Sequence, residues 1–530
     1  MSKKEMKKIK ILIISFVFLC GCSVKYYEKS AEKDIKEIWN KSYKKVENKK
    51  LPESALNEET FTETKILSLS DAIKLGLENN REYKTEKENV YMKILDFTYQ
   101  RYLFKKRYGL GGNVNWEKVD EESVSGDLDF SLIKLLSNGA QITFNLTQEF
   151  LKYFTGNKEK DFQTFLSLDF FQPILKGAGR EIALEDLTQS ERDVIYEIRD
   201  FLRYERKLSV EITKKYLDVV ARKKNLDTFW KNYQFLKRIR ERNENLADAG
   251  RISTIQVDMA RQDEFSAYQR WINALNDYKN AIDEFKVFLG ISPSENIEIK
   301  SKNLEEILTK GVKKFNVDLK TGIKQAFRNR LDLITYYEKV KDAERKVKVA
   351  INNLKGTLDL NFEIESDTEE KSKPSIDFQK PEYSFGIDFE LPVDKLKERN
   401  EYKEKLIELD RARRNFEEKK DNVKLEVIEN YRNLEDAYQS YLIQKNSLSL
   451  AEKRIDSTDL LFQAGRATTR DILEAQRSYL LAETSLTSAS INYIKSYLDF
   501  LLSCEMIEVD IDKIWKGDKY EEIFGKIGEK

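Results

Sequence analysis

Two distant segments of the chain place their core positions at the same spacing. After Gly250, and again after Gly465, small and large residues alternate at steps of three and four positions. The first seam consists of Val257, Ala260, Glu264, Ala267, Trp271, Ala274, Tyr278, Ala281 and Phe285, and the second of Ile472, Ala475, Tyr479, Ala482, Leu486, Ala489, Tyr493, Ser496 and Phe500. Such heptad spacing is typical of helices that pack as coiled coils. Its return in phase at a long fixed offset indicates a duplicated unit.

Each seam follows a long helical tract and a tight turn. The tracts cover residues 181–249 and 396–464. At about 1.5 Å per residue, each would span roughly 100 Å as one continuous helix. Each tract ends at a glycine, and a Ser or Thr shortly afterwards caps the next helix. A shorter helix, around Ala72 or Gly322, opens each unit.

Between the opening helix and the long tract, apolar and polar residues alternate in two segments of each unit. The alternation predicts strands around residues 141–147 and 162–170 in the first unit and around 358–365 and 384–391 in the second. Known membrane barrels have at least about 8 strands. Four strands from one chain therefore cannot close a barrel, and several chains must contribute.

The first residues have the pattern of a secretory signal. A lysine-rich start precedes an apolar run at residues 11–19, which is too short to span a bilayer. The run leads into Leu19-Cys20-Gly21-Cys22, which resembles the bacterial lipobox and implies cleavage after Gly21 and diacylglycerol on Cys22. The alternative is an ordinary signal with an incidental cysteine. No later segment has the roughly 18 consecutive apolar residues of a membrane helix, so any membrane crossing must use strands.

Composition narrows the function. Lys+Arg and Asp+Glu both number 93, which argues against a nucleic-acid partner held by a positive field. The chain has no His, the commonest general base and metal ligand. Its three cysteines, Cys20, Cys22 and Cys504, do not have the spacing of a Zn site. We therefore expect no enzyme activity, cofactor or metal centre.

The order of these features resembles the TolC-like outer-membrane efflux family across about residues 66–505. The opening stretch Leu69-Ser70-Asp71-Ala72-Ile73 resembles the family's first helix. Residues 171–179, Phe-Gln-Pro-Ile-Leu-Lys-Gly-Ala-Gly, resemble its strand exit. Residues 464–476, from Ala-Gly-Arg to Asp-Ile-Leu-Glu-Ala-Gln, resemble its periplasmic hairpin. Each motif alone is weak, whereas their order and duplication are specific.

The resemblance implies a mainly α fold with a β-barrel portion, in which duplicated helix-strand-strand-helix-helix units form a trimer. Three chains would supply a 12-stranded outer-membrane barrel and a long periplasmic helical tube. The expected function is the exit duct of a tripartite efflux or type I secretion system. The expected partners are two further copies of the chain, a periplasmic adaptor, an inner-membrane transporter and outer-membrane lipid. The expected location is the outer membrane, with a lipid anchor and an extension into the periplasm.

The same resemblance divides the chain into segments. They are a signal peptide at 1–21, a lipidated tether at 22–65, the first repeat at 66–290, an equatorial segment at 291–320, the second repeat at 321–505 and a tail at 506–530. The first repeat carries extra residues around Gly109–Ser137. They extend a surface loop or plug the mouth, and the sequence leaves both open.

Acidic residues on the polar strand faces of the second repeat are candidates for the barrel lumen. They are Asp359, Glu363, Glu365, Asp388 and Glu390. A ring of carboxylates favours cations. The alternative is that some of them lie beyond the bilayer.

Two further sites lie at the other end of each unit. The turns at Gly250-Arg251 and Gly465-Arg466 are candidates for the adaptor contact, although both pairs of residues also suit a plain helix cap. Acidic residues ring the periplasmic aperture in the family, which implies that role for Asp471 and Glu474. Ordinary acidity at a helix start is the alternative.

One rival hypothesis for the whole chain is a non-conducting, coiled-coil structural lipoprotein of the envelope. The alternating strands favour the duct, because a spacer made of coiled coils has no use for them.

Overall fold

The computed structural model describes residues 24–46, 65–118, 122–153, 161–300, 312, 314–316, 318–368 and 378–507. The chain divides into two compact units, each assembled from separated segments. The first unit comprises Met1–Leu51, Glu88–Arg199 and Thr335–Phe416, and the second comprises Pro52–Lys87, Asp200–Ile334 and Glu417–Lys530. Each unit takes residues from both sequence repeats, so a repeat of the chain is not a unit of the fold.

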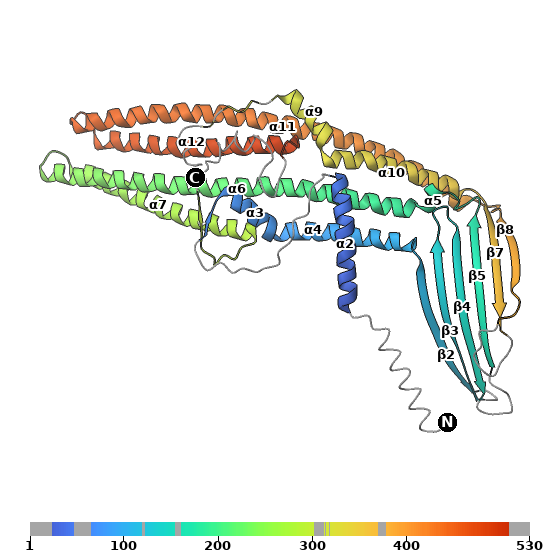
Figure 1. Cartoon of the computed structure of the whole chain (residues 1–530). Helices are drawn as coiled ribbons and strands as arrows, with labels where there is room; N and C mark the ends of the chain where they lie inside the picture. Colours follow the sequence, from blue (N-terminus) through green and yellow to red (C-terminus); the bar gives the residue numbers. More distant parts are fainter. Residues whose placement is uncertain are drawn as a thin grey trace, which may run out of the picture. The chain divides into compact units, whose positions relative to one another are not determined.

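Helices dominate the described chain (Figure 1). They are α2 (Val24–Val46), α3 (Leu69–Asn79), α4 (Arg81–Leu103), α5 (Arg180–Ala183), α6 (Glu185–Asp248), α7 (Thr254–Leu289), α9 (Leu319–Asn329), α10 (Leu331–Asn353), α11 (Leu396–Gln463) and α12 (Thr469–Ser503). The strands are β1 (Lys65–Leu67), β2 (Arg107–Lys118), β3 (Glu122–Leu135), β4 (Gln141–Tyr153), β5 (Asp161–Pro173), β6 (Ile297–Ile299), β7 (Thr357–Asp367) and β8 (Glu382–Glu390). None of the described helices combines the length and apolar character needed to cross a bilayer.

The helices confirm the duplication predicted from the sequence, whereas the first repeat supplies two more strands of the sheet than the second. The opening helices α3 and α9 both have 11 residues, and the helices that follow them, α4 and α10, both have 23. The long tracts form α6 with 64 residues and α11 with 68. A side chain caps the N-terminus of each opening helix. The Ser68 side chain accepts a hydrogen bond from the backbone N–H of Asp71, and the Asp318 side chain accepts one from the backbone N–H of Thr321.

The heptad seams form the core of the second unit. Every predicted seam position of α7 and α12 is buried or half-buried. Ala260 and Ala267 of α7 lie in one apolar cluster with Ile472 and Ala475 of α12. Leu236, Ile239, Ile455 and Phe462, from α6 and α11, complete this cluster with Leu473. The alanines leave room for the larger side chains opposite, as in knobs-into-holes packing.

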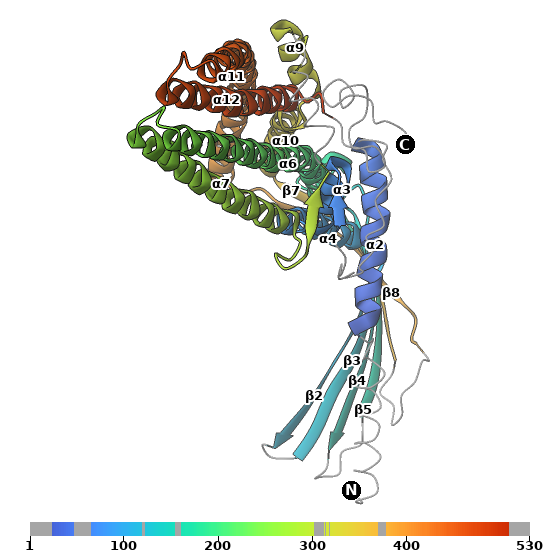
Figure 2. The ribbon, with the colours of Figure 1, turned by 90° about the vertical axis from the view of Figure 1, so that its left-hand side faces the viewer.

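The first unit contains a single antiparallel sheet in the order β2-β3-β4-β5-β7-β8 (Figures 1 and 2). The mainly helical fold with a strand portion is confirmed, but the sheet has six strands rather than the predicted four. The two additional strands are β2 and β3, which take up most of the extra segment around residues 109–137. In β2, Gly109, Gly111 and Gly112 interrupt the alternation of apolar and polar residues, which weakens the sequence pattern of this strand.

A small parallel sheet consists of β1, which precedes α3, and β6, which follows α7. β1 pairs with β6, from Lys65 with Ile297 to Leu67 with Ile299. The hydroxyl of Tyr216 on α6 lies within hydrogen-bond distance of two carbonyls, that of Lys300 at 2.9 Å and that of Leu67 at 3.2 Å. This contact fixes both strands against the long helix.

Candidate functional site

The five predicted lumen carboxylates share one face of the sheet. The register pairs Asp359 with Asp388, and successive odd positions of β7 bring Glu363 and Glu365 to the same side. Glu390 lies opposite Thr357 on that face. Whether this face surrounds a lumen is a property of an assembly, so the lumen role stays a prediction.

Further carboxylates join this polar face across the strands. They are Asp127 and Asp129 of β3, Glu149 of β4, Asp169 of β5, Asp367 of β7 and Glu382 of β8. Within the described strands, Arg107 is the only basic side chain that the register places there. The face is therefore strongly negative, and the sequence patterns of the second repeat revealed only part of it.

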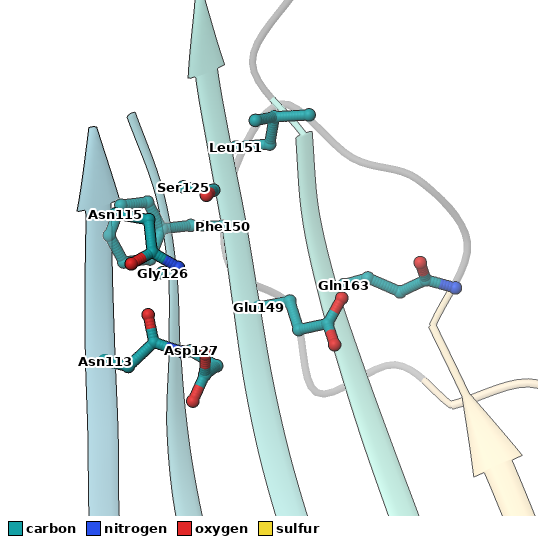
Figure 3. Close-up of a pocket in the computed structure, with 9 residues that line it drawn as sticks. All are labelled: Asn113, Asn115, Ser125, Gly126, Asp127, Glu149, Phe150, Leu151 and Gln163. Carbon is teal, nitrogen blue, oxygen red and sulfur yellow. Dashed lines mark hydrogen bonds between the residues drawn. The ribbon is translucent and has the colours of Figure 1, made fainter. Parts of the chain in front are cut away.

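Figure 3 shows one row of this face, at a hollow of about 310 Å³. Asn113, Asp127, Glu149 and Gln163 follow one another from β2 to β5 in register. Amides thus flank two carboxylates on neighbouring strands. The row supplies several hydrogen-bonding groups to water or solute.

The donors to these carboxylates are neutral groups. The Asn113 amide donates to Asp127 at 2.6 Å, the Thr147 hydroxyl donates to Asp129 at 2.7 Å, and the Asn145 amide donates to Asp169 at 3.3 Å. Amide and hydroxyl donors hold the carboxylates in place without cancelling their charge. The face consequently keeps a negative potential.

The opposite face of the same sheet is apolar and exposed. One register row on it reads Tyr108, Leu132, Phe144, Leu168, Ile364 and Tyr383 across all six strands. On β8 the exposed fractions of Phe385 and Phe389 are 68% and 72%. Strands with a largely apolar face on one side and a largely polar face on the other are typical of a sheet that borders lipid on one side and water on the other.

The two hairpin turns of the second unit have the same backbone. Gly250 and Gly465 both have φ of +69°, which only glycine adopts without strain. In each turn the glycine N–H bonds to a carbonyl of the preceding helix, Ala247 or Phe462, as in a Schellman cap. Arg251 and Arg466 follow and are exposed, as are both glycines.

Asp471 and Glu474 already have local partners. The Asp471 carboxylate accepts from the backbone N–H of Thr468 at 2.8 Å and from its hydroxyl at 2.7 Å, in a capping box. These hydrogen bonds lower the pKa of Asp471 below its usual range. Glu474 forms an ion pair with Arg454 of α11 at 2.9 Å, with both side chains exposed. Arg454 could not be predicted as this partner from the sequence, because the contact joins distant positions.

Cys22 falls outside the described residues, which begin at Val24. Lipidation therefore stays a prediction. Among the described residues, no group of three or more His, Cys, Asp or Glu side chains is arranged to hold a metal ion.

Comparisons with known proteins found one matching family model and several solved structures with a similar fold. Residues 322–499 match the family model of the outer membrane efflux protein. None of the curated protein sequences matches the chain. Among solved structures, CusC, studied for its transmembrane channel formation, is similar with a TM-score of 0.62 at 12% identity, covering 86% of this chain and 96% of its own.

Two further structures resemble the chain over most of its length. The outer membrane protein VceC of Vibrio cholerae has a TM-score of 0.61 at 12% identity, covering 82% of this chain and 95% of its own. The CmeC outer membrane channel of Campylobacter jejuni has a TM-score of 0.59 at 15% identity, covering 91% and 99%. Residues 322–499 carry the sequence pattern of the outer membrane efflux protein family, and the described chain shares the fold of these three solved structures.

Proposed function

We propose that the protein is the outer-membrane exit duct of a tripartite efflux or type I secretion system, through which substrates pass passively to the exterior. The observation that carries the proposal is the two-faced sheet, apolar and exposed on one side and rich in carboxylates on the other. A non-conducting coiled-coil lipoprotein gives this sheet no role.

The duct is a homotrimer in the outer membrane that extends into the periplasm. Support comes from the sheet itself, which has two unpaired edges, β2 and β8, and therefore cannot line a pore alone. Support for the lipid anchor comes from the lipobox pattern that ends at Cys22. A diacylglycerol chain adds membrane affinity to that of the apolar strand faces.

Ion selectivity tests the duct directly. A lumen lined by Asp359, Glu363, Glu365, Asp388 and Glu390 attracts cations. The purified protein in a planar bilayer, under a salt gradient, should therefore give a reversal potential of cationic sign. Asp359→Asn with Asp388→Asn should reduce this preference, whereas Glu298→Gln in β6 is the matched control and should leave it unchanged. Anion preference, or no conductance from a folded trimer, contradicts the proposal.

In this proposal the adaptor binds at the hairpin turns and in turn recruits an inner-membrane transporter. The exposed Arg251 and Arg466 stand next to tight glycine turns, so each presents its charge at the end of a hairpin. Arg251→Glu with Arg466→Glu should lower crosslinking to the adaptor while the trimer persists. Arg432→Glu, an exposed charge reversal within α11, is the control. Equal crosslinking in both variants would show that the turns are not part of the adaptor contact.

A further inference from the structure

The β2–β3 hairpin is part of the six-stranded antiparallel sheet. β2 pairs with β3 along its whole length, from Arg107 with Ile133 to Lys118 with Glu122. β3 continues the ladder with β4, from Ser123 with Tyr153 to Leu135 with Gln141. An extracellular loop or a plug would leave most of these backbone groups outside the ladder.

Close packing between β3 and β4 agrees with this pairing. A Cβ at Gly126 would come within 2.6 Å of the Phe150 ring of β4. Glycine is therefore required where the hairpin meets the strand predicted from the sequence. Figure 3 shows the Phe150 ring beside Gly126.

The hairpin also has an apolar face and a polar face, and each lies on the same side as the corresponding face of the other strands. On the apolar face, the Tyr108 and Phe130 rings lie 6.4 Å apart, and Phe130 and Phe144 are again 6.4 Å apart. On the polar face, Asp127 and Asp129 bond to Asn113 of β2 and Thr147 of β4. A segment that only filled the mouth would have no reason to match both faces.

The hairpin moves one free edge of the sheet from β4 to β2. Both edge strands, β2 and β8, carry exposed apolar side chains, with Val114 exposed by 71% and Phe389 by 72%. Within a bilayer, unpaired edge groups cost several kcal/mol each, so the edges must find partners. Neighbouring strands alternate in direction through all six strands, so β2 and β8 run in opposite directions. β8 of one copy is thus oriented to pair antiparallel with β2 of the next.

We propose that three copies of this chain close an 18-stranded wall by pairing β2 of each copy with β8 of its neighbour, six strands from each chain. The inference rests on the trimer of the proposed function and departs from the 12 strands that the family resemblance implies. Barrel diameter grows roughly linearly with strand number, so this wall is about 1.5 times as wide as one of 12 strands. Asp127 and Asp129 from each chain extend its acidic lining.

Inter-chain disulfides distinguish the two walls. Cysteines replace outward-facing apolar residues, Leu110 or Val114 on β2, Phe144 or Leu146 on β4, and Phe385 or Ile387 on β8. Leu110→Cys and Val114→Cys should crosslink between copies when combined with the β8 cysteines. The β4 variants should not crosslink with the β8 cysteines, and single-cysteine variants serve as controls for chance contacts. Crosslinks from β4 to β8, or none from β2 in an intact trimer, overturn the 18-stranded wall.

Counting strands in the unmodified trimer by electron cryomicroscopy gives an independent answer. Eighteen strands support the inference, and twelve, with the hairpin outside the wall, overturn it. A protein that never forms trimers in detergent or lipid counts against the proposed function instead.

Discussion

Gly250 and Gly465, one in each repeat, adopt the same left-handed backbone conformation with φ of +69°. In both turns the N–H of the next residue donates at 2.8 Å to the carbonyl of a leucine in the preceding helix, Leu246 or Leu461. A Cβ at either glycine would meet nothing within 4 Å. The backbone alone therefore requires glycine at these turns.

Replacing these glycines should cost stability through backbone strain only. For an L-residue, the left-handed region costs roughly 1–2 kcal/mol, so Gly250→Ala and Gly465→Ala should each lower the free energy of unfolding by about 1 kcal/mol. Asn tolerates this region better, so Gly465→Asn should cost less than Gly465→Ala. Denaturant unfolding of the hairpin helices, followed by circular dichroism, measures both. Equal losses for Ala and Asn would show that something other than φ limits the position.

Removing charge from Asp471 and Glu474 should abolish block by multivalent cations. Threefold symmetry would bring six such carboxylates together, and a divalent or trivalent cation would bind between them. The variant Asp471→Asn with Glu474→Gln keeps the shape of both side chains and should conduct without block when the ion is added on the periplasmic side. The trimer should persist in this variant.

Asp258, on the matching helix of the first repeat, gives the control for this experiment. The positions that correspond to Asp471 and Glu474 are Gln256 and Met259, so the acidic ring should come from the second repeat. Asp258→Asn should leave the block intact. If the double variant is blocked as strongly as the parent, Asp471 serves only as a helix cap and Glu474 only as the partner of Arg454.

Asp332 should stabilise the second unit down to acidic pH. Burial would raise the pKa of Asp332, but the hydrogen bonds and charge of Arg330 and the charge of Arg203 hold that pKa well below its usual range. Arg330 is 1% exposed and lies 3.0 Å from the Asp332 carboxylate, so losing this partner leaves a buried charge. Asp332→Asn should therefore lower the free energy of unfolding at pH 7 by about 3 kcal/mol.

The pH dependence follows from the depressed pKa. The contribution of Asp332 is fully present above the unfolded value of about 3.9 and is lost as pH falls through the lower folded pKa. Unfolding curves of parent and Asp332→Asn should thus differ by a constant amount near neutral pH and converge only below about pH 4. Glu426→Gln removes a more exposed partner of Arg330 and should cost no more than about 1 kcal/mol. A gap between parent and Asp332→Asn that closes already at pH 6 would contradict the assignment.

Cys22, rather than the neighbouring Cys20, should carry the lipid. Cys22→Ala should abolish labelling of the protein by a fatty-acid probe, while Cys20→Ala should leave labelling in place. The Cys22→Ala protein should still reach the membrane, because the apolar strand faces supply their own affinity. Labelling that survives in Cys22→Ala would show that Cys22 is not the lipid attachment site, as expected if the N-terminus is an ordinary secretory signal.

Local periodicity explains what could be predicted from the sequence. The seam from Val257 to Phe285 and its copy from Ile472 to Phe500 mark buried positions. Residues three or four positions apart lie on the same face of a helix, and this face packs against the neighbouring helix. β4, β5, β7 and β8 were found because their side chains alternate between an apolar and a polar face. The same rule predicts that Asp359 and Asp388 lie on polar strand faces, and the register pairs them on one face of the sheet.

Contacts between residues far apart in the chain are visible only in the folded structure. The glycines of β2 weaken its alternation, and the place of this strand in the sheet is defined by its hydrogen bonds to β3. The pairing of Glu474 with Arg454, and of Arg203 with Asp332, joins positions on different helices. Local propensity carries no information about such pairs, because they form only when long helices pack in one register. Local sequence patterns thus reveal the repeat, the helices and the alternating strands, whereas packing sets the width of the sheet and the partners of its charges.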